Sequence, residues 1–197
     1  MTLSVTLSEL LDPDVQRART QLIAAMGHDP ALHPHFWEAW VATVTTGAVT
    51  PHKHAFDISL MCWRELQIEV KFSRGFLISF DNGRRRCFKW LMTQPQMKRA
   101  VRPDAVLLIG IDDGRVWMWC CSPNEVGRSI TVTVPNVRLG SPKGSPFDKH
   151  LVPPLDLLPA ILRVCHLTYD AKEHAKNARV TRFVKQGQDD LFIVRAA

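Results

Sequence analysis

Residues 64–73 carry the most constraining pattern in this 197-residue chain. Apolar side chains occupy every second position, at Leu66, Ile68, Val70 and Phe72, and every residue between them is polar. Successive side chains of a β-strand point to opposite faces, so an alternation of this kind separates a core face from a polar face. The segment therefore predicts a strand with one face in the protein core.

The segments on either side predict helices and further strands. A helix is expected over residues 13–26, because Asp12 and Pro13 form a typical helix start and Gly27 a typical stop. A second helix is expected from Pro34 to Gly47, and a basic amphipathic helix, kinked near Pro95, over residues 84–100. Strands are expected near 55–60, 64–73, 76–80, 105–111, 115–121 and 130–134, and the C-terminal part predicts helices near 157–168 and 170–178 and a hairpin of 180–184 with 191–194.

This order of elements predicts an α/β fold with a central mixed β-sheet flanked by helices. Hydrophobic residues make up 46% of the chain and charged residues 22%, values typical of soluble globular proteins, which excludes wholesale disorder and fibrous architectures. We expect one domain over residues 1–197, with its core at about 34–134, a loop at 135–154 and a helical and hairpin extension at 155–197. The chain shows neither a membrane-span pattern nor a signal-peptide pattern, so a cytoplasmic protein without a membrane partner is expected, with its five cysteines reduced.

Positive charge is concentrated after the predicted third strand. The whole chain has a net charge of +6, and residues 84–102 contain seven basic residues and no acidic one. A segment of this kind favours a polyanionic partner, most simply DNA, although a solvated helix face gives the same pattern. The expected nucleic-acid-binding residues are Arg84, Arg85, Arg86, Lys89, Lys98 and Arg99.

Asp57, Glu69 and Lys71 are the residues most suited to chemistry. Asp57 lies on the strand before the alternating one, and Glu69 and Lys71 share the polar face of the latter. Paired carboxylates provide hard oxygen ligands for Mg²⁺ or Mn²⁺, and a neighbouring lysine can position or help to deprotonate a water molecule. This set of groups is suited to phosphodiester hydrolysis.

The arrangement resembles the PD-(D/E)xK nuclease superfamily, which includes many restriction endonucleases. Phe56-Asp57 stands where the family often has Pro-Asp, and Glu69-Val70-Lys71 matches the second half of the motif. The resemblance covers about half of the chain and implies a restriction-endonuclease-like core. It also implies that Asp57, Glu69 and the Val70 carbonyl bind the cation and that Lys71 orients the attacking water.

The resemblance predicts a Mg²⁺-dependent DNA endonuclease of a restriction-type, phage or mobile-element kind, compatible with a homodimer. Glu38 and Gln67 are candidate additional site residues. A chain of this composition holds about one acidic-x-lysine triplet by chance, and a second one occurs at Asp170-Ala171-Lys172. Two alternatives therefore stay open: the polar row of the strand is the solvent face of an antiparallel sheet, or the protein is a non-catalytic nucleic-acid-binding or assembly module.

Overall fold

The computed structural model describes residues 4–51, 56–62, 64–81, 83–92, 102–134, 146–167 and 169–170. Its helical elements are α1 (Leu7–Leu10), α2 (Pro13–Met26), η1 (Pro30–Leu32), α3 (Pro34–Thr45), η3 (Pro146–His150), η4 (Pro154–Asp156) and a helix over residues 157–167. Its strands are β1 (Val5–Thr6), β2 (Ala48–Val49), β3 (Ile58–Met61), β4 (Glu65–Arg74), β5 (Phe76–Phe80), β6 (Gly83–Leu91), β7 (Ala105–Asp112), β8 (Arg115–Cys121), β9 (Ser129–Thr133) and β10 (Leu151–Val152).

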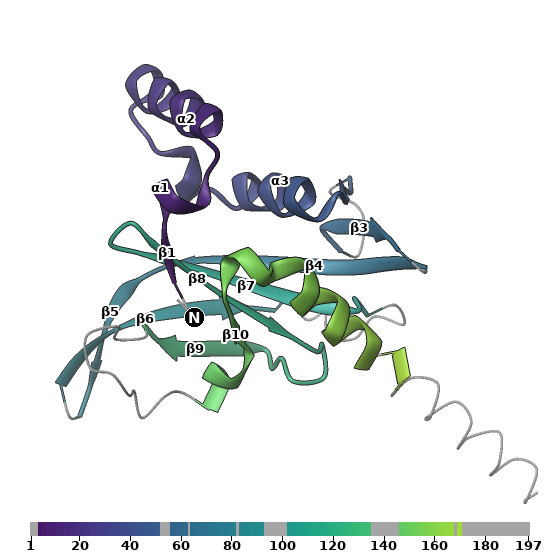
Figure 1. Ribbon diagram of the computed structural model, residues 1–197. Helices are drawn as coiled ribbons and strands as arrows, with labels where there is room; N and C mark the ends of the chain where they lie inside the picture. Colours follow the sequence, from purple (N-terminus) through teal and green to yellow (C-terminus); the bar gives the residue numbers. More distant parts are fainter. Residues whose placement is uncertain are drawn as a thin grey trace, which may run out of the picture.

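The strands form two sheets, and α3 and the helix over residues 157–167 cover one face of the larger sheet (Figure 1). The seven-stranded sheet has the order β1-β8-β7-β4-β3-β2, with β10 also paired to β8. It is mixed, because β4 and β7 are parallel while the other neighbours are antiparallel. The three-stranded sheet, in the order β5-β6-β9, lies on the opposite side from α3. The expected α/β fold with a central mixed sheet is confirmed at this level.

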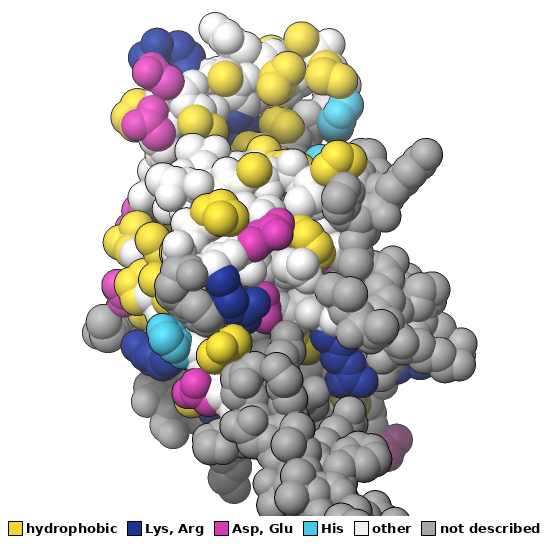
Figure 2. Space-filling model, turned by 90° about the vertical axis from the view of Figure 1, so that its right-hand side faces the viewer, with side chains coloured by type: hydrophobic (Ala, Val, Ile, Leu, Met, Phe, Trp, Pro, Cys, Tyr) yellow, Lys and Arg dark blue, Asp and Glu magenta, His cyan; other side chains and the backbone are white. Residues whose placement is uncertain are grey.

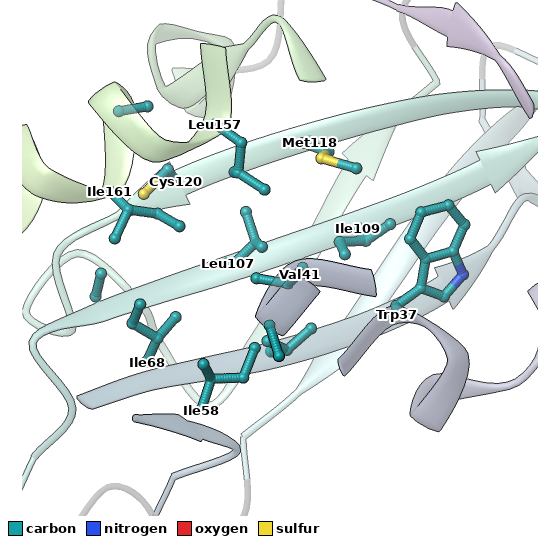
Figure 3. Close-up of a cluster of buried hydrophobic side chains, with 14 of the residues drawn as sticks. Trp37, Val41, Ile58, Ile68, Leu107, Ile109, Met118, Cys120, Leu157 and Ile161 are labelled. Carbon is teal, nitrogen blue, oxygen red and sulfur yellow. The ribbon is translucent and has the colours of Figure 1, made fainter. Parts of the chain in front are cut away.

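Two apolar cores hold these layers together. One core lies between the seven-stranded sheet and the helices, where Trp37 and Val41 of α3 pack with Ile58, Ile68 and strand β7 (Figure 3). The second core joins the two sheets and is dominated by aromatic side chains, namely Phe88, Trp90, Trp117 and Trp119, whose rings contact one another. The alternation in residues 64–73 therefore directs the apolar side chains of β4 into the first core, as expected.

The expected helix over residues 84–100 is wrong for its first part, because residues 83–91 form strand β6. Phe88 and Trp90 are buried while Lys89 and Leu91 are exposed, a period of two that suits a strand. The three consecutive arginines hide this alternation, since they contribute charge but no apolar periodicity. Residues 93–101, which include the expected kink, lie outside the described residues, as does the expected C-terminal hairpin. Within the expected 135–154 loop, residues 146–150 form η3 and residues 151–152 form β10.

The two sheets are joined at a close contact around Gly75. Strand β4 continues into β5 through this single residue, whose N–H donates to the Ile111 carbonyl at 2.7 Å. A Cβ atom at Gly75 would lie 2.3 Å from the Asp112 carboxylate, so a larger residue would displace that carboxylate. Arg86 of β6 donates to both carboxylate oxygens of Asp112, at 2.8 and 2.7 Å from its Nε. The contact needs glycine at this position and fixes β6 to the end of β7.

Helix α2 stands apart from both cores at the top of the molecule (Figure 1). It buries none of its residues among those described, and its exposed apolar side chains include Leu22, Ile23 and Met26. Figure 2 shows apolar side chains spread over this end of the molecule.

The cysteines behave as expected for a chain without disulfides. Cys62 is exposed, and the other four are buried free thiols. Burial raises the pKa of the Cys121 thiol to about 12 and raises that of Cys120 as well, so both remain protonated at neutral pH.

Candidate functional site

Asp57 is fixed against the middle of β4 by two hydrogen bonds. It immediately precedes β3, and its backbone N–H donates to the Ile68 carbonyl at 3.1 Å. Its carboxylate oxygen Oδ2 accepts the backbone N–H of Val70 at 2.8 Å. Strand β3 begins only at Ile58, so no residue of β3 lies opposite Val70. The Asp57 carboxylate accepts the Val70 N–H in place of a strand carbonyl. The carboxylate is thus placed at the Glu69-Val70-Lys71 triplet.

Glu69 and Lys71 project from the same face of β4 and form an ion pair with each other. The Lys71 ammonium contacts the Glu69 carboxylate, and the two side chains are 22% and 3% exposed, respectively. Their register partners on β7 are Val106 and Leu108, which belong to the core between the two sheets. Glu69 is therefore a buried carboxylate, and the open interpretation of this row as a solvent face is wrong at this position.

The pKa of Asp57 shows which charges surround it. Burial raises the pKa of this carboxyl above its usual value, and the nearby negative charge of Glu38 raises it further. The Val70 N–H and the positive charges of Lys71 and His35 act in the opposite direction. Groups from β4 and from α3 therefore act electrostatically on the carboxylate that precedes β3. The structure brings Asp57, Lys71 and the candidate Glu38 into one charged neighbourhood.

Helix α3 contributes Glu38 together with a residue that the sequence reasoning missed. The Glu38 side chain is only 13% exposed. The His35 ring nitrogen Nδ1 lies 2.8 Å from Glu38 Oε2. The i, i+3 spacing of these two residues was the available signal, since it places them on one helix face.

Gln67 is held in place by a buried acid at the start of β7. Its backbone N–H donates to Asp104 Oδ2 at 3.0 Å, and the Asp104 N–H donates back to the Gln67 carbonyl at 2.6 Å. Asp104 also pairs with Arg64 at 2.7 Å. Gln67 shares the β4 face of Glu69, while Glu65, on the same face, accepts a hydrogen bond from Ser59 at 2.8 Å.

The basic residues of β6 divide between two faces. Arg84 and Arg86 lie on one face and Arg85 and Lys89 on the other. All four are exposed, and Arg86 is also held by Asp112. The remaining expected nucleic-acid-binding residues, Lys98 and Arg99, lie outside the described residues. Because the Asp112 carboxylate engages Arg86, the cations of β6 left for a polyanion are Arg84, Arg85 and Lys89.

Two carboxylates are the groups here that could hold a hard divalent cation. Asp57 and Glu69 offer two carboxylates on neighbouring segments, and Mg²⁺ in proteins is commonly held by one or two carboxylates with several water molecules. The proximity of Glu38 to Asp57 adds negative charge that a cation would neutralise. Within the part of the chain that the structure describes, no group of three or more His, Cys, Asp or Glu side chains is close enough to hold a metal ion. A cation here would therefore depend on two carboxylates, a carbonyl and water.

Comparison with known proteins adds no relative. No protein-family model matches this chain, and no curated protein sequence matches it either. Among the described residues, no helix is both long and apolar enough to cross a membrane.

Proposed function

We propose that this protein is a Mg²⁺-dependent DNA endonuclease that hydrolyses phosphodiester bonds and is similar to the PD-(D/E)xK nucleases. The observation that carries the proposal is the 2.8 Å hydrogen bond from the Val70 N–H to the Asp57 carboxylate. This bond places the first acid of the motif beside Glu69 and Lys71, which are otherwise separated from it along the chain.

The order of the elements supports the proposal. Helix α3 precedes three antiparallel strands, β2, β3 and β4, and β7 then joins β4 in parallel. The motif acids lie at the start of β3 and in the middle of β4, as the resemblance implies. Between β4 and β7, where the sequence predicts a helix over residues 84–100, the described residues form the β5–β6 hairpin. The resemblance is therefore better supported at Asp57 and Glu69-Val70-Lys71 than in the segment that connects β4 to β7.

The proposed roles follow from where each group is held. Asp57, Glu69 and the Val70 carbonyl are the ligands for Mg²⁺ or Mn²⁺, and Lys71 orients the attacking water. A bound divalent cation supplies an acidified water and stabilises negative charge that develops on the phosphate. Lys71 contacts Glu69, so its ammonium is already held beside the proposed ligand. Glu38, which contacts His35, is the candidate third acid. Gln67 is a candidate hydrogen-bond donor to a bound water or phosphate.

A second candidate function is a non-catalytic nucleic-acid-binding or assembly module. The observation that favours it is the Glu69–Lys71 ion pair, which gives the buried carboxylate a cationic partner without any metal. In this alternative the pair is structural, and the exposed cations of β6 bind nucleic acid. The first candidate expects DNA as partner, the second expects nucleic acid, and both are compatible with a homodimer.

The deciding experiment is Mg²⁺-dependent cleavage of plasmid DNA by the wild-type protein and two variants. Glu69→Ala deletes an oxygen ligand, so Mn²⁺ affinity measured by calorimetry is expected to fall together with cleavage. Lys71→Ala leaves the ligands in place, so the cation is expected to bind while single-turnover cleavage slows by orders of magnitude. Arg163→Ala, on the helix over residues 157–167, is the charge-matched control. Wild-type rates in both site variants would refute the assignment, and no cleavage of varied DNA and RNA substrates would favour the binding module.

A further inference from the structure

The outer face of the three-stranded sheet carries aromatic and basic side chains together. Phe88, Trp90, Ile130 and Val132 of β6 and β9 point into the core between the sheets. The residues that alternate with them must therefore face away from the core. We define the outer face as those residues and their partners on β5: Phe76, Ile78, Phe80, Arg85, Cys87, Lys89, Leu91, Ser129, Thr131 and Thr133.

The strand register places this set on one surface. Phe76 stands opposite Cys87, and Ile78 stands opposite Arg85, while Cys87 on its other side faces Thr133. Directly opposite residues in an antiparallel pair share a face, so the register places these side chains of β5, β6 and β9 beside one another on one surface. Cys87, on the central strand of this sheet, is buried.

Two aromatic rings on this surface are partly exposed. Phe76 is 38% exposed and Phe80 is 44% exposed, and the Arg85 guanidinium lies 5.8 Å from the centre of the Phe80 ring. The two phenylalanines are four residues apart on one strand, which separates them by roughly 13 Å. Each ring can therefore stack with a different base.

The charges of this sheet complement a polyanion. Strands β5, β6 and β9 contain four basic residues and no acidic one. Two of these cations, Arg85 and Lys89, lie on the outer face beside the hydroxyl groups of Ser129, Thr131 and Thr133. Exposed rings, cations and hydroxyls on the face of a sheet are the combination with which proteins bind single-stranded nucleic acid.

We propose that the outer face of the three-stranded sheet binds single-stranded DNA, with bases stacked on Phe76 and Phe80 and phosphates paired with Arg85 and Lys89. Single-stranded DNA is favoured over duplex because the bases of a duplex are stacked on one another and cannot reach a ring on a sheet face. The choice of DNA rests on the proposed function, whose substrate is DNA. The surface extends that function by naming the strand form that the protein engages.

The test measures binding in EDTA, so that it does not depend on the proposed cation. Fluorescence anisotropy with a labelled oligodeoxythymidine is expected to show binding that a duplex of equal length competes with weakly. Phe80→Leu, which keeps an apolar side chain but removes the ring, is expected to weaken binding about ten-fold, as does loss of one stacked base. Leu77→Ala is the matched control, because Leu77 is 57% exposed on the opposite face of the same strand.

A second pair of variants tests the phosphate contacts. Arg85→Ala is expected to weaken binding and to reduce the salt slope by about 0.7, the value for one phosphate of a single strand. Arg163→Ala removes the same charge from an exposed position on the helix over residues 157–167, which packs on the opposite side of the seven-stranded sheet, and is expected to change binding less than two-fold. Equal effects of the two substitutions would indicate a diffuse electrostatic contact and would overturn the assignment of the face.

Three further outcomes would overturn the proposal: wild-type binding by Phe80→Leu, equal affinity for duplex, or tighter binding of oligouridine than of oligodeoxythymidine. The first two outcomes would rule out base stacking on this face, and the third would identify RNA as the ligand. Failure here is distinguishable from failure of the proposed hydrolysis. Cleavage without single-strand binding would refute the proposed binding surface but not the proposed hydrolase. Single-strand binding without cleavage of any substrate would refute the hydrolase but not the surface.

Discussion

Replacement of Lys71 by methionine tests the ion pair at the centre of the site. Glu69 is 3% exposed at its side chain, and Lys71 provides the positive charge that contacts it. Methionine preserves most of the length and apolar contact of the lysine stem but removes the ammonium. Breaking a buried ion pair costs about 3–5 kcal/mol, and the 22% exposure of Lys71 lowers that figure because water reaches the site. We therefore expect the free energy of unfolding to fall by about 2–3 kcal/mol.

The assay is urea unfolding followed by tryptophan fluorescence at neutral pH. Most of the change is expected in the midpoint, with the slope retained. The double variant Glu69→Gln/Lys71→Met is the control, since it removes both charges and is expected to be more stable than Lys71→Met alone. A single variant within about 0.5 kcal/mol of wild type would refute the reasoning, because that is the size of an ordinary surface effect.

Addition of Mn²⁺ then separates a structural pair from a cation site. A ligand at one hundred times its Kd stabilises a folded protein by about 2.7 kcal/mol. If Glu69 is a ligand, Mn²⁺ is expected to stabilise Lys71→Met but to have much less effect on the double variant, which lacks the carboxylate. Equal stabilisation of the two variants would place any bound cation elsewhere.

Three further substitutions test other parts of the structure. The change in the free energy of unfolding caused by Asp57→Asn is expected to be more favourable at pH 7 than at pH 3. The reason is that the raised pKa of Asp57 makes the folded state lose stability as pH rises through that pKa, and asparagine has no such loss; equal effects at both pH values in urea unfolding would contradict this. Gly110→Ala would place a Cβ 2.8 Å from the Phe88 ring, so a loss of about 1–3 kcal/mol is expected, and an unchanged Tm would disprove the close packing of the sheets. Arg86→Ala leaves the buried Asp112 carboxylate without its bidentate partner, so the free energy of unfolding is expected to fall by about 1–3 kcal/mol in urea unfolding. An unchanged free energy would show that the contact between the sheets does not depend on Arg86.

Much of the central sheet could be predicted, because β4 alternates strongly while β7 and β8 are continuous apolar runs. Residues 64–73 have an apolar side chain at every second position, and the register of β3 and β4 then follows from the short connection between them. Strand β6 could not be recognised in the same way, since three arginines occupy the positions at its start. The decisive alternation begins only at Phe88, and its partners Trp117 and Trp119 are distant in the sequence.

The candidate site was accessible from the sequence only where its residues are neighbours along a strand. The common face of Glu69 and Lys71 follows from strand geometry alone. The hydrogen bond from Val70 to Asp57 requires β3 to begin at the next residue, and strand ends are poorly defined by periodicity. The proximity of Glu38 to Asp57 depends on how α3 packs on the sheet, which a helical wheel does not contain.

The most direct test of the account is the location of a bound cation in crystals of the protein soaked in Mn²⁺. Anomalous scattering identifies the ion independently of any activity. The account predicts a peak between the carboxylates of Asp57 and Glu69 and the Val70 carbonyl, with Lys71 beside it. Crystals that contain bound Mn²⁺ elsewhere, with the Glu69–Lys71 pair intact and no peak at Asp57, would contradict the central claim.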